Sequence, residues 1–288
     1  MKKFWKIGVI AILGIFTLTG CKTDDMEDIE IVTTSYPIEY ITERLYGDHA
    51  LVTSIYPDGT NIREYVMTPK QLSDFSKKDL FIYNGLSDES KIAIELLDRN
   101  KNLKIIDSAS VLETSYGMEE LWLNPSHLLM MSQNIRKGFD EYLTSTYLKK
   151  EVDERYEELK VDLSELDANI KLTAANATNK TIVVSNNTLK YLNKYGFNVI
   201  SLEEDGNLLQ KTIDEVKTMI QNKKINYIFI LEYDQINSTI QSLLDDTDVE
   251  ALTFRRLDNI KDEERNNKKD YLTIMKENIE LLQKEVYQ

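Results

Sequence analysis

Several residue types are scarce in this chain, and each scarcity excludes a class of site. Histidine occurs only twice, at His49 and His127, so a zinc site with three histidine ligands is excluded. Cysteine occurs once, at Cys21, which leaves no partner for an internal disulfide. The 10 glycines form no glycine-rich phosphate loop, and no nucleophile or cofactor motif is present. We therefore expect that the protein is not an enzyme.

Positive charge is also scarce relative to negative charge. The chain has 35 basic and 49 acidic residues, which gives a formal net charge of -14. Nucleic acids require a basic surface, so we expect no nucleic-acid partner, and the acidic surface is best explained by solubility. A length of 288 residues is enough for two domains with separate cores.

The amino-terminal residues indicate a targeting segment. Lysines near the start precede a short apolar run over residues 7–16, which is too short to span a bilayer comfortably. Leu-Thr-Gly-Cys at residues 18–21 looks like a bacterial lipobox, in which the cysteine becomes lipid-modified (palmitate). We predict a signal peptide over residues 1–20, lipidation at Cys21 and a flexible tether over residues 21–28. The mature protein would then be anchored on the outer face of the cytoplasmic membrane.

The rest of the chain alternates between strand and helix patterns. Residues 29–35 and 181–185 are β-branched and apolar, as in buried strands, and residues 225–231 are nearly continuous apolar sequence. Helical spacing of apolar residues follows each of these strands. The pattern predicts an α/β fold with two lobes, each a parallel sheet flanked by helices.

A long helical segment divides the two predicted lobes. Residues 147–172 carry apolar residues at helical spacing for about six turns without an internal glycine or proline. We predict a first lobe over residues 29–146, one connector helix over 147–172 and a second lobe over 173–288.

Short motifs spread over the chain identify a family. They are Thr34-Ser35-Tyr36-Pro37-Ile38, Gly47-Asp48, Gly59-Thr60, Tyr65, Thr68-Pro69, Phe81-Ile82-Tyr83-Asn84-Gly85-Leu86 and Trp122-Leu123-Asn124-Pro125. In order and spacing the chain resembles the zinc and manganese group of solute-binding lipoproteins of bacterial ABC importers, which includes adhesin-type lipoproteins. The resemblance runs from about residue 29 to the carboxyl terminus. It implies a partner permease with a separate ATPase chain, and we expect a monomer.

The resemblance also implies a metal site in the cleft between the lobes, but the residues at its four positions have changed. Arg63 and Glu120 stand where the family has histidines, and Asn186 stands where it usually has histidine or glutamate. Asp258 keeps the acidic type usual at the fourth position. Glu64 is a possible additional ligand.

Three interpretations of this cleft remain open. Carboxylate and amide oxygens could hold one divalent ion harder than zinc, such as manganese, magnesium or calcium, although Arg63 would repel it. Alternatively, no metal binds, and Arg63 pairs with Glu120 or Asp258 to lock the lobes. In the third interpretation, a small organic solute places its carboxylate on Arg63 and its amine on Glu120 or Asp258. An adhesin-type surface role is a further alternative.

Overall fold

A computed structural model describes residue 26 and residues 28–288 of the chain. The predicted signal peptide and the predicted lipidation of Cys21 lie outside the described residues. Within the predicted tether, Met26 is buried, and its backbone oxygen accepts a hydrogen bond of 2.6 Å from the Tyr46 hydroxyl. At Met26 the chain therefore already packs against the first lobe, and the extent of the tether over residues 21–28 stays a prediction.

The first lobe is a four-stranded parallel sheet between two layers of helices. Its strands are β1 (Ile29–Thr33), β2 (Ala50–Ser54), β3 (Leu80–Tyr83) and β4 (Lys104–Asp107), in the sheet order β2-β1-β3-β4. Its helices are α1 (Tyr36–Tyr46), η1 (Gly47–His49), α2 (Pro69–Phe75), α3 (Glu89–Arg99), α4 (Glu120–Leu123) and α5 (Pro125–Tyr142). Successive residues of β1 point to opposite faces, so Ile31 joins the core under α1 and α5, and Val32 joins the core under α3.

The second lobe repeats this arrangement. Its strands are β5 (Thr181–Val184), β6 (Asn198–Ser201), β7 (Tyr227–Leu231) and β8 (Glu250–Phe254), in the order β6-β5-β7-β8. Its helices are η2 (Asn187–Tyr195), α7 (Gln210–Gln221), α8 (Ser238–Asp246), α9 (Asp262–Asn266) and α10 (Tyr271–Val286). All strand pairs in both sheets are parallel, so the carboxyl ends of the strands gather at one edge of each sheet.

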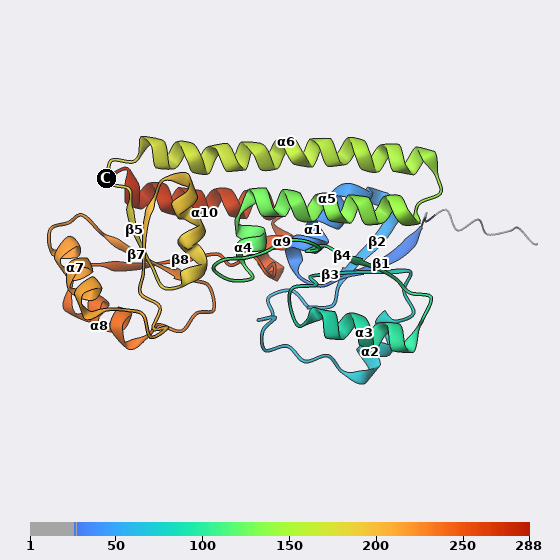
Figure 1. The fold of residues 1–288 in the computed structure, drawn as a ribbon, viewed down its shortest axis with the longest axis horizontal. Coiled ribbons are helices and arrows are strands. Elements are labelled where there is room, and N and C mark those ends of the chain that lie inside the picture. The colour runs from blue at the N-terminus through green and yellow to red at the C-terminus, as the bar shows by residue number, and fades with distance from the viewer. Residues whose placement is uncertain (1–25, 27) are drawn as a thin grey trace, which may run out of the picture.

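One long helix, α6 (Thr146–Asn176), runs along both lobes, as Figure 1 shows at the top of the view. It packs against α1 and α5 of the first lobe and against α10 near its other end. Its apolar stripe is buried at every predicted position: Val152, Tyr156, Leu159, Leu163, Leu166 and Ile170. The α/β fold with two lobes is confirmed, while the lobe boundaries stay predictions.

The segment after β8 crosses back to the first lobe before α10 begins. The backbone N–H of Gly59 donates to the Ile260 carbonyl and to the Asn259 side chain, both at 2.8 Å. Arg265 forms ion pairs with Asp58 at 2.5 Å and with Glu39 at 3.0 Å. These contacts tie the crossing segment, residues 255–270, to the loop that follows β2 and to α1. Within the described part of the chain, no helix is both long and apolar enough to cross a membrane.

Candidate ligand-binding cleft

A cavity of about 810 Å³ lies between the two lobes. The first lobe lines it with segments that follow β2, β3 and β4, and the second lobe contributes residues that follow β5 and β6. Asp258, from the crossing segment, also lines it. Ligands of parallel α/β sheets bind at the carboxyl ends of strands, and this volume falls in the range of small-molecule sites. The cavity is therefore the candidate binding site.

Arg63 reaches the cavity from the loop that follows β2. Its guanidinium forms an ion pair with Glu119, which sits just before α4. The Arg63 side chain is 51% exposed, whereas the Glu119 side chain is only 5% exposed. The predicted pairing of Arg63 with Glu120 or Asp258 is therefore wrong, because Arg63 meets the neighbouring carboxylate instead.

Glu120 points away from the cavity and does not line it. Its carboxylate accepts hydrogen bonds from the backbone N–H groups of Ser115 at 2.9 Å and Tyr116 at 3.1 Å. It also lies 3.9 Å from the ring of His127, whose pKa is lowered by burial. Glu120 thus stabilises the loop that precedes α4 in the sequence. Adjacent residues at a helix start face different directions, so the motif position identified the correct segment but the wrong carboxylate.

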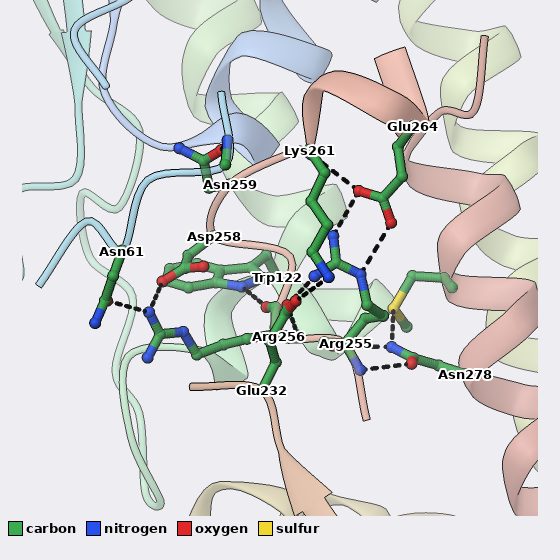
Figure 2. Close-up of polar contacts among 12 residues, drawn as sticks. Asn61, Trp122, Glu232, Arg255, Arg256, Asp258, Asn259, Lys261, Glu264 and Asn278 are labelled. Carbon is green, nitrogen blue, oxygen red and sulfur yellow. Dashed lines mark hydrogen bonds and ion pairs between the residues drawn. The ribbon is translucent and has the colours of Figure 1, made fainter. Parts of the chain in front are cut away.

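Asp258 lines the cavity and is buried beside an arginine that the sequence reasoning missed. Nη2 of Arg256 lies 2.5 Å from Oδ2 of Asp258, and each of the two residues is 1% exposed. Figure 2 shows this pair beside Asn61, whose side-chain oxygen accepts a hydrogen bond of 3.0 Å from the same Nη2. Neither Asp258 oxygen accepts a hydrogen bond from the described residues, so the contact with Arg256 is an ion pair. Burial raises the pKa of Asp258, and Arg256 opposes that change.

A second group of charged side chains stabilises the backbone next to this pair. Glu232, just after β7, forms ion pairs with Arg255 and, at 2.8 Å, with Lys261. Burial acts to raise the pKa of Glu232, but Lys261 and Arg255 lower it below its usual value. Arg255 also binds Glu264 of α9 at 2.6 Å. Figure 2 shows these side chains converging around Arg255. The group fixes the backbone from which Arg256 and Asp258 project.

The two remaining predicted positions contribute little to a cation site. Asn186 lines the cavity, but its side-chain oxygen accepts a hydrogen bond of 2.8 Å from the Thr188 N–H and caps η2. Glu64 is exposed and does not line the cavity. The geometry therefore brings Arg63, Asn186 and Asp258 to one cavity and leaves Glu64 and Glu120 outside it.

The cavity residues do not fit the metal site that the resemblance implies. Across residues 26 and 28–288, no three histidine, cysteine, aspartate or glutamate side chains form a group that could hold a metal ion. Two of the carboxylates that line the cavity already face a guanidinium, Glu119 facing Arg63 and Asp258 facing Arg256. The Arg-Arg pair two residues before Asp258 was the available sequence signal for this arrangement.

Comparison with known proteins places the chain in a family. The family described as zinc-uptake complex component A, periplasmic, matches residues 31–285, so the chain belongs to that family. A metal ABC transporter substrate-binding lipoprotein of Lactococcus lactis is 25% identical, with 96% of each chain covered. The manganese ABC transporter substrate-binding lipoprotein PsaA of Streptococcus pneumoniae is 24% identical over 77% of this chain and 78% of its own. The family consists of solute-binding proteins, so the chain is not an enzyme.

A solved structure shows the same fold. The Zn(II)-bound ZnuA-like domain of Streptococcus pneumoniae AdcA superposes with a TM-score of 0.73 at 21% identity, covering 91% of this chain and all of that domain. The chain spans 59% of the length of full AdcA, a zinc-binding lipoprotein.

Proposed function

We propose that this chain is the extracytoplasmic substrate-binding lipoprotein of an ABC importer, anchored through Cys21. It holds a solute in the cavity between its lobes and presents it to a membrane permease whose ATPase is a separate chain. The single observation that carries the proposal is the cavity between the two parallel sheets, in a member of the zinc-uptake family.

A second candidate function is favoured by the charges in the cavity. Two of the carboxylates that line it, Glu119 and Asp258, each face an arginine. A protein whose cleft supplies its own cations needs no ion to neutralise these carboxylates. It would then be a diverged member of the family that binds no metal, with a cleft that is either locked by an Arg63–carboxylate pair or occupied by a small organic solute.

Trp122 offers a direct probe of binding. It lines the cavity and is the only tryptophan in residues 22–288, because the other, Trp5, falls in the predicted signal peptide. Purified residues 22–288, treated with a chelator, should be titrated separately with Zn²⁺, Mn²⁺, Ca²⁺ and Mg²⁺. A saturable change in Trp122 emission together with a higher melting temperature would identify a cargo ion. Absence of both with every ion would favour the second candidate, and carboxylic and amino acids should be tested next.

The role in import needs a separate test in cells. A photo-crosslinking amino acid at Val66, an exposed residue beside the cavity-lining Tyr65, should capture a permease subunit that mass spectrometry can identify. The matched control is the same label at Val161, which is exposed on α6. Equal capture at both positions, or capture at neither, would contradict the proposed docking. A Cys21→Ala variant should be released from the membrane fraction.

A further inference from the structure

Among the arginines and lysines of the described residues, Arg256 is the only one that is buried. It leaves the end of β8, and its side chain is 1% exposed. Its backbone is held on both sides: the carbonyl oxygen accepts a hydrogen bond of 2.7 Å from the Trp122 indole, and the N–H donates to Glu232 at 3.3 Å. The direction of the side chain is therefore set by a rigid backbone.

The guanidinium of Arg256 has partners in both lobes. Nη2 contacts Asp258 of the crossing segment and Asn61 of the first lobe, and Cζ lies 5.0 Å from the ring centre of Tyr233, which follows β7 in the second lobe. A cation over an aromatic ring and beside a carboxylate is held by attraction on two sides. The guanidinium thus joins the lobes at the wall of the cavity.

We infer that Arg256 keeps divalent ions out of the cleft, because its tethered guanidinium is the cation that neutralises Asp258. This inference rests on the proposed function, since it concerns the ligand of the same cavity. A buried carboxylate needs a cation, and a charge on the chain itself is present at all times. A divalent ion approaching Asp258 is repelled by that positive charge, so its binding is opposed.

Arg63 cannot serve this purpose in the same way. It is half exposed and pairs with Glu119 rather than with Asp258, so water can replace it and screen its charge. The two arginines therefore form a matched pair for experiment, one buried and shared between the lobes, the other on the rim of one lobe.

The test uses four variants of residues 22–288: R256M, D258N, R256M/D258N and, as the control, R63M. Melting temperatures are measured after chelation and again with added Mn²⁺ or Zn²⁺, and bound ions are counted by native mass spectrometry. We expect the native protein and R63M to bind neither ion. R256M should melt lower than the native protein and should regain part of the loss when Mn²⁺ is added. The double variant should melt above R256M and lose the response to Mn²⁺, because no buried charge then needs a partner.

Two results would overturn the inference. One is a melting shift or bound ion in the native protein, and the other is an R256M variant that gains nothing from either Mn²⁺ or the second substitution. If R256M does not fold, the comparison of D258N with the double variant decides: D258N alone should melt lower, because it leaves Arg256 buried without its carboxylate. These measurements use purified protein, so they are independent of the crosslinking test. Failure to contact a permease would defeat the proposed function without touching the role of Arg256.

Discussion

The indole nitrogen of Trp122 donates a hydrogen bond of 2.7 Å to the backbone carbonyl oxygen of Arg256. This contact links α4 of the first lobe to the end of β8 in the second. The backbone oxygen of Trp122 in turn accepts a hydrogen bond of 2.5 Å from the Tyr271 hydroxyl at the start of α10. Trp122 is thus a junction between three segments that are distant in sequence, and it also lines the cavity.

Replacing Trp122 by phenylalanine should lower the free energy of unfolding by about 2–4 kcal/mol. The substitution leaves the buried carbonyl of Arg256 without a donor, at a cost of about 1–3 kcal/mol, and removes part of a packed side chain. Urea denaturation followed by circular dichroism measures the loss. Tyr287→Phe is the control, because Tyr287 is exposed and should change little. A W122F variant as stable as the native protein would show that the hydrogen bond and packing of Trp122 do not contribute to stability.

Removing Arg63 should have a small effect on stability. The Arg63 side chain is half exposed, whereas its partner Glu119 is buried at the wall of the cavity, so the pair should contribute more than the ~1 kcal/mol of an exposed pair and less than the ~3–5 kcal/mol of a buried one. We therefore expect Arg63→Ala to lower the free energy of unfolding by about 1–2 kcal/mol, below the effect of removing buried Arg256. Thermal melting of the two variants side by side measures the difference. An R63A variant that is as destabilised as the Arg256 variant would restore the idea that Arg63 locks the lobes.

Asn278 of α10 fastens the backbone of Arg255. Its side-chain oxygen accepts from the Arg255 N–H at 2.9 Å, and its amide nitrogen donates to the Arg255 carbonyl at 3.0 Å. The residue is fully buried, so Asn278→Leu should cost about 2–4 kcal/mol, because two backbone groups lose their partners. Asn278→Asp keeps only the acceptor and should also destabilise. If N278L melts at the native temperature, the backbone groups of Arg255 must find other partners.

The sequence predicted the fold well because local patterns and buried stripes determine it. The apolar spacing over residues 147–172 predicted a helix, and every residue of that stripe is buried in α6. The continuous apolar residues of β7 likewise predicted a central strand, since a parallel sheet covered on both faces has little room for polar side chains.

The site was harder to predict because it depends on side-chain directions at segment ends. Motif spacing located Arg63 and Asp258 at the cavity, but it selected Glu120 where Glu119 faces the cavity. The role of Arg256 depends on a turn after β8 that brings it back onto Asp258, and helix and strand periodicity say nothing about such a turn.

Lowering the pH from 8 to 5 should stabilise this protein, and Glu285 should be one cause. Its carboxylate is buried at the end of α10 and accepts from the N–H groups of Asn226 at 3.2 Å and Tyr227 at 3.1 Å. Burial raises its pKa from 4.5 to about 7, although the two N–H groups oppose the change. The folded state therefore binds the proton more tightly than the unfolded state. The stabilisation is complete below pH 4.5 and is lost as the pH rises through about 7.

Glu285→Gln should reduce this pH dependence. A pKa difference of about 2.5 units (7 minus 4.5) corresponds to at most about 3 kcal/mol between acid and neutral pH. Burial raises the pKa values of Glu39 and Glu89 to about 7 as well, so E285Q removes only part of the total. Urea denaturation at several pH values between 5 and 8 should give a flatter profile for E285Q than for the native protein. Glu280→Gln, on the exposed side of the same helix, should keep the native profile, and an E285Q profile identical to it would refute the assignment.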